Sequence, residues 1–146
     1  MSNPGTNSTD TVTVNATIPE TLPPIISMVA TIFEVDPATL SGSTQLMVDL
    51  PCESIDLLEL GASLNRHFRV SINDDAAFLR SLRVHVAEAN RTGRDAAATV
   101  QTAYPHLAAT RAEALVAALA TQGAVPQLTL GDIATYVSHA LNRTPH

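Results

Sequence analysis

Apolar residues recur every three or four positions along most of this chain, and that spacing constrains the fold more than any other feature. It places them on one face of an α-helix, whereas a half-exposed strand alternates with a period of two. The spacing predicts six helices, over about residues 19–33, 54–68, 74–89, 95–104, 110–123 and 129–141. The predicted core is made of residues on their apolar faces: Leu22, Ile25, Ile26, Val29, Ile32, Phe33, Ile55, Leu57, Leu58, Leu60, Leu64, Phe68, Phe78, Leu82, Val86, Leu115, Val116, Leu119, Ile133, Tyr136, Val137, Ala140 and Leu141. The sequence therefore predicts an all-α fold.

Turn-forming and capping residues indicate where these helices begin and end. Pro37 ends the first helix, because a residue that precedes proline avoids the α region. Thr129 is the predicted cap of the last helix, and Thr110 with Glu113 has the spacing of a capping box. The other predicted helix ends are Gly93, Pro105 and Gly123.

The chain reads as one domain without metal, disulfide or membrane span. Residues 1–17 are polar and small, which predicts a disordered tail before a single domain over 18–146. Cys52 is the single cysteine, so neither an internal disulfide nor a cysteine-based zinc site is expected, and the five histidines lack metal-site spacing. No apolar run is long enough to cross a bilayer, and no basic residue precedes Arg66, so we expect a cytoplasmic protein.

Charge is divided unevenly along the chain. The net charge is −6, which argues against nucleic acid as the main partner. Residues 1–60 hold eight acidic residues and no basic one, whereas all eight arginines lie after them. An acidic half of this kind favours a partner with a basic surface.

Ser54 is the candidate functional residue. It lies at the start of the helix predicted over 54–68, directly after a loop closed by Pro51. Such an end presents unpaired N–H groups and a positive dipole, so a phosphate on the hydroxyl would be well placed there. From the residues alone, a simple N-cap is the commoner role for a serine at this position.

The stretch from Leu46 to Phe68 resembles the phosphopantetheine attachment region of acyl carrier proteins. That family has a pattern of the type L-x-x-D-L-G-x-D-S-L-D-x-x-E-L at the start of its second helix. The residues that match in unbroken register are Leu46, Asp49, Leu50, Ser54, Asp56, Glu59 and Leu60, with Ile55 in place of leucine. Similarity to the family extends over about residues 20–75 and 127–141.

This resemblance implies a carrier rather than an enzyme. The implied fold is an acyl-carrier-like helical bundle, expanded here by extra helices inserted over 76–127. Ser54 would carry a covalent 4'-phosphopantetheine arm that holds an acyl or aminoacyl group as a thioester. Glu53, Asp56 and Glu59 would contact basic residues of the phosphopantetheinyl transferase and of acyl-activating, acyltransferase or synthase enzymes. A monomer is expected.

The chain also departs from the family pattern. Pro51 replaces a glycine, Glu53 replaces an aspartate, and the far half of the helix is nearly uncharged, which favours a specialised carrier. The inserted residues 76–127 have helical periodicity and five arginines. They are open to three interpretations: a docking surface, a lid over the acyl chain, or additional core.

The residues also allow other interpretations of the chemistry and of the function. Cys52 has acidic neighbours, which would raise its pKa, so a small apolar side chain is expected rather than a nucleophile. The alternative function is an unmodified, carrier-like helical adaptor that binds proteins. No catalytic constellation in the sequence supports an enzyme.

Overall fold

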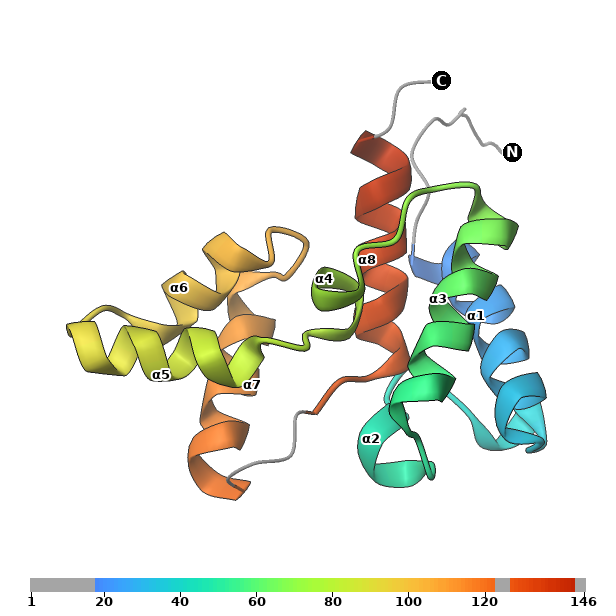
Figure 1. Cartoon of the computed structure of the whole chain (residues 1–146), viewed down its shortest axis with the longest axis horizontal. Helices are drawn as coiled ribbons and strands as arrows, with labels where there is room; N and C mark the ends of the chain where they lie inside the picture. The colour runs from blue at the N-terminus through green and yellow to red at the C-terminus, as the bar shows by residue number, and fades with distance from the viewer. Residues whose placement is uncertain (1–17, 123–126, 144–146) are drawn as a thin grey trace, which may run out of the picture.

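The computed structural model describes residues 18–122 and 127–143, and within these ranges the chain is all-α, as predicted (Figure 1). The predicted tail 1–17 and the predicted stop at Gly123 lie outside the described residues. In chain order the elements are α1 (Ile18–Phe33), the 3-10 helix η2 (Pro37–Thr39), α2 (Leu46–Asp49), α3 (Ser54–Phe68), α4 (Asp74–Phe78), α5 (Leu82–Thr92), α6 (Ala96–Ala103), α7 (Ala109–Gln122) and α8 (Leu130–Arg143).

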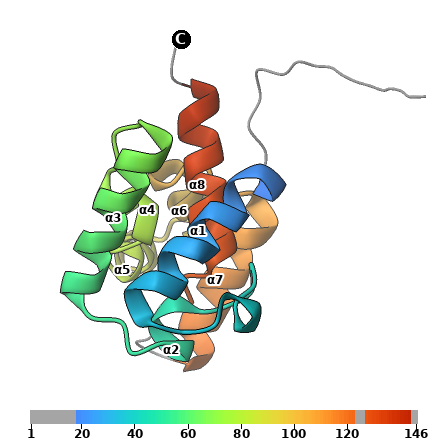
Figure 2. The same ribbon diagram turned by 90° about the vertical axis from the view of Figure 1, so that its right-hand side faces the viewer.

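Helix α8 is the centre of the main core. Helices α1 and α4 both pack against it, and α3 packs against α1 and α4 (Figures 1 and 2). The apolar faces predicted from the spacing are buried here, since Ile25, Val29 and Ile133 are fully inaccessible to solvent. Helices α1 and α8 are also joined by a hydrogen bond, 3.0 Å long, between the buried hydroxyls of Thr21 and Ser138.

Helices α5, α6 and α7 form a second group, on the side of α8 opposite α1 and α3 (Figure 1). Helix α6 packs against both α5 and α7. Leu82 and Leu115, from the apolar stripes predicted for these helices, are buried in the same continuous core as the residues of α8. The segment expected as an insertion is therefore largely helical and contributes to the core.

The single helix predicted over 74–89 is wrong, because the chain breaks at Leu79 into α4 and α5. Leu79 adopts a left-handed conformation (φ 53°) and is completely buried. Just beyond it, the Ser81 N–H donates to Asp75 Oδ1 at 2.8 Å, and the Tyr104 hydroxyl donates to the same oxygen, also at 2.8 Å. These bonds, together with burial of Leu79, offset the cost of a left-handed leucine.

The other predicted boundaries have mixed outcomes. Gly93 caps α5 with a positive φ of 72°, and α6 ends before Pro105, as predicted. The capping box predicted at Thr110 is wrong: α7 begins at Ala109, because its first turn is closed by the Ala112 N–H on the Ala108 carbonyl, and Thr110 lies inside that turn. Helices η2 and α2 lie within the stretch predicted as a loop.

Candidate functional site at the start of helix α3

The segment that leads to Ser54 is held by the start of α8. The Leu46 N–H donates to the Leu128 carbonyl at 2.9 Å, and Gln45 forms an isolated antiparallel bridge with Thr129. Leu46 itself is fully buried, which anchors the short helix α2 to the core. The chain then passes exposed Pro51 and enters α3 at Ser54.

Ser54 is the first residue of α3 and not its cap. The cap is Glu53, whose N–H donates to Asp56 Oδ2 at 2.8 Å. Ser54 is exposed, and the described residues offer its hydroxyl no hydrogen-bond partner. The ordinary capping role considered for this serine is therefore filled by its neighbour, and the hydroxyl faces solvent.

The first turns of α3, where Ser54 lies, carry exposed apolar side chains. Ile55 and Leu58 are 68% and 58% exposed, so their predicted place in the core is wrong. The helix has a narrower buried face than predicted, made of Leu57, Leu60, Gly61 and Leu64, because α1 and α4 cover only that side. Met47 and Val48 of α2 are also exposed, at 37% and 54%.

Acidic groups share this surface. Glu53 and Glu59 are exposed, whereas Asp56 is partly buried because its carboxylate closes the helix N-terminus. Burial, with the negative charges of Asp56 and Glu53, raises the pKa of the Cys52 thiol to about 11. The thiol therefore stays protonated at neutral pH, which agrees with an inert side chain.

A groove of about 660 Å³ between α1 and α3 reaches from Glu59 to Arg66.

The first turn of α3 has backbone N–H groups that no described acceptor uses. The Ser54 and Ile55 N–H groups have no acceptor among the described residues, so the first turn of α3 has donors to offer an anion. Glu53 and Asp56 oppose a negative group electrostatically. A covalent bond to the Ser54 hydroxyl would hold a phosphate despite this repulsion, so the phosphate would not need to bind tightly by non-covalent contacts.

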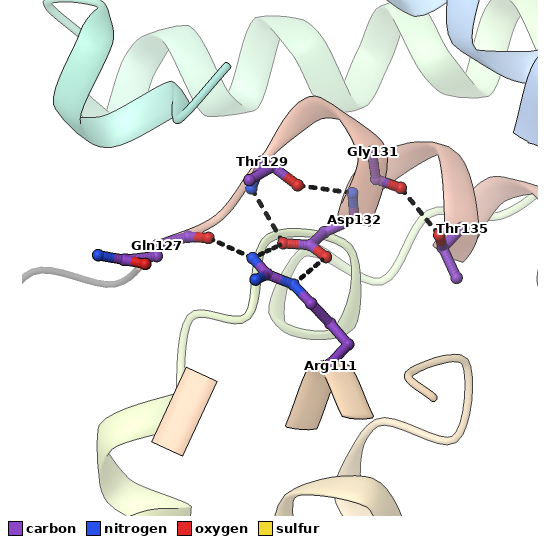
Figure 3. A network of polar contacts seen from close by, with 6 residues as sticks. All are labelled: Arg111, Gln127, Thr129, Gly131, Asp132 and Thr135. Atoms are coloured by element: carbon purple, nitrogen blue, oxygen red, sulfur yellow. Dashed lines mark hydrogen bonds and ion pairs between the residues drawn. The ribbon is translucent and has the colours of Figure 1, made fainter. Parts of the chain in front are cut away.

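A polar network fixes the start of α8, which in turn holds α2 (Figure 3). Arg111 of α7 contacts Asp132 through its Nε at 2.8 Å and its Nη2 at 2.7 Å, and also donates to the Gln127 carbonyl. Asp132 accepts from the Thr129 N–H at 3.0 Å and donates its own N–H to the Thr129 hydroxyl, which confirms the predicted cap at Thr129. This role of Arg111 was not predictable from local sequence, because its partner lies 21 residues away.

His106 is a second residue that the sequence analysis did not single out. It is buried against Tyr136 and Tyr104, and its Nε2 atom has no hydrogen-bond partner. Burial, and to a smaller extent the nearby His139, lower its pKa to about 4, although Asp132 acts in the opposite direction. The imidazole is thus neutral at physiological pH and serves as a packing element between the α6–α7 connection and α8.

Within residues 18–122 and 127–143, no cluster of three or more His, Cys, Asp or Glu side chains is arranged to hold a metal ion. None of the described helices has both the length and the apolar character needed to span a membrane. Comparison with known proteins gives no matching family model, curated protein or solved structure.

Proposed function

We propose that the protein is a specialised acyl carrier, with a 4'-phosphopantetheine arm on Ser54 that presents an acyl or aminoacyl group to biosynthetic enzymes. The observation that carries this proposal is the Ser54 hydroxyl, which is exposed at the start of α3 and has no partner among the described residues. It occupies the serine position of the motif that resembles acyl carrier proteins. The arm would supply a terminal thiol that binds the cargo as a thioester.

In this proposal the chain contributes attachment and presentation. The Ser54 hydroxyl oxygen would form a new bond to phosphorus as adenosine 3',5'-bisphosphate leaves coenzyme A, in a reaction catalysed by the transferase. Ile55 and Leu58 would give that enzyme an apolar contact beside the serine. Glu53 and Glu59 would attract its basic residues.

Mass spectrometry after incubation with coenzyme A and a broad-specificity phosphopantetheinyl transferase tests the proposal. The wild-type chain should gain one prosthetic group, and Ser54→Ala should gain none. Ser71→Ala, which removes another exposed serine hydroxyl, is the matched control and should be modified like the wild type. A wild-type chain that stays unmodified, or a gain that survives Ser54→Ala, would overturn the carrier assignment.

The exposed apolar surface also fits the second candidate, an unmodified helical adaptor. Ile55 and Leu58 would then bind a partner protein directly, and the Ser54 hydroxyl would stay unmodified. The two candidates differ in one result: Ser54→Ala would leave an adaptor's partner binding intact, whereas it would abolish cargo loading by a carrier.

A further inference from the structure

Helices α5 and α7 leave a groove between them that the proposed carrier function does not use. Both pack against α6, and the groove has a volume of about 340 Å³. Its apolar lining includes Val86, Val116 and Leu119, and Arg83 lies at its edge. It is built entirely from the segment expected as an insertion.

The wall formed by α5 is basic. Between Arg80 and Arg94 the sequence holds four arginines and one glutamate. Arg83 and Arg91 of α5 are exposed and lie eight residues apart, close to two turns, so they share one side of the helix. Arg80, also exposed, lies in the turn just before the helix. Arg91 pairs with Glu88, but both side chains are more than half exposed, so solvent screens that pair. Val84, 66% exposed, adds apolar area to this basic face.

The start of α3 presents the complementary surface. Ile55 and Leu58 are exposed there beside Glu53 and Glu59, and the segment 46–60 has four acidic residues and no basic one. The two faces lie on opposite sides of α8, so the α3 face of one molecule cannot reach its own α5–α7 groove (Figure 1). A second copy of the chain is needed to bring them together.

We propose that the α5–α7 groove of one molecule binds the acidic, apolar start of α3 in a second copy, so that the protein self-associates reversibly. The contact is head-to-tail, since it joins two different surfaces. A net charge of −6 on each copy opposes association, so the contact is weak and depends on the local match of charge. It does not depend on modification of Ser54.

Sedimentation velocity over about 10 µM to 1 mM tests this contact at low and at high salt. The wild type should be monomeric at the lowest concentration, and its average mass should rise with concentration at low salt but much less at 0.5 M salt. Arg83→Glu and Glu59→Arg, both at exposed helical positions, should each weaken the association by about tenfold or more, because like charges then face each other. Arg69→Glu alters an exposed arginine at the far end of α3, outside both surfaces, and should leave association unchanged.

An equimolar mixture of the two reversed variants gives the sharpest result. In that mixture every groove can meet an α3 face of opposite charge, so association should recover to near the wild-type level. A wild type that is monomeric to about 1 mM at low salt would overturn the proposal and leave the groove to an acidic segment of another protein. Association that resists Arg83→Glu, or that the mixture does not restore, would also overturn it.

Discussion

Acidification should destabilise the fold through His106. Its pKa falls from the ordinary 6.5 to about 4 in the folded protein, mainly because the ring is buried. A proton on the ring would place a positive charge where the Nε2 atom has no partner. The unfolded chain has an imidazole of ordinary pKa, so between about pH 6.5 and 4 it binds more protons than the folded chain. Stability must therefore fall as the pH falls.

The size of this effect follows from the two pKa values. The contribution of neutral His106 is fully present above about pH 6.5, decreases as the pH falls towards 4, and is lost below that value. The linkage relation gives a loss of about 2 kcal/mol at pH 5 and about 3 kcal/mol when protonation is complete. Losses of this size are a large fraction of the stability of an ordinary domain.

Urea unfolding of the wild type and of His106→Leu at pH 7.5, 6 and 5 measures the effect. Carboxylates titrate in both proteins, so the informative quantity is the difference between their unfolding free energies. The unfolding free energy of the wild type, relative to that of His106→Leu, should fall by about 2 kcal/mol between pH 7.5 and 5. Val84→Ala, which changes an exposed side chain that does not titrate, is the control, and its difference from the wild type should stay constant. A constant difference for His106→Leu across this range would refute the reasoning.

Three further experiments with substituted chains test other parts of the structure. Leu82→Ala should lower the free energy of unfolding by about 2–5 kcal/mol in urea titrations, because the side chain is fully buried; a loss below about 1 kcal/mol would contradict its place in the core. Arg111→Met and Asp132→Asn should each destabilise the protein, and a double-mutant cycle should give a coupling of about 1–3 kcal/mol, moderated by the 29% exposure of the arginine side chain. If the losses of unfolding free energy in the two single variants simply add in the double variant, the contact between Arg111 and Asp132 does not stabilise the fold. Glu59→Lys should slow transferase modification several-fold at low salt with little effect at high salt, whereas Asp56→Lys should also weaken α3 because it removes the carboxylate that accepts from the Glu53 N–H. Equal rates for Glu59→Lys and the wild type at low salt would place the transferase interface elsewhere.

Helix positions were predictable where a long apolar stripe and a local end signal agree. The helix 54–68 has both and matches α3, and Gly93 ends α5 as predicted. The break at Leu79 was not predictable, because its local sequence favours a continuous helix. The contact that stabilises the break joins Asp75 to Tyr104, 29 residues later. Helical periodicity contains no information about such a distant partner.

The position of Ser54 was predictable from the sequence, but its surroundings were not. Periodicity places Ile55 and Leu58 on the broad apolar side of α3, and a broad stripe predicts burial. Which part of a stripe is buried depends on how many helices cover it, and that is a property of the assembled fold. Likewise, the bond between Arg111 and Asp132 needs two helices whose relative placement the sequence does not reveal.

The exposed residues beside Ser54 support the proposal that the start of α3 is a contact surface. Leu57, Leu60 and Leu64 already bury one face of the helix against the core, so the fold does not require apolar side chains at Ile55 and Leu58. Each of these two residues exposes more than half of its surface to water, without a gain in stability from burial. Two large apolar side chains next to a solvent-facing serine, with acidic groups around them, have the apolar centre and polar edge of a protein-binding site. A partner that recognises this surface also gains access to the Ser54 hydroxyl, which is the arrangement that a transferase and later enzymes would need.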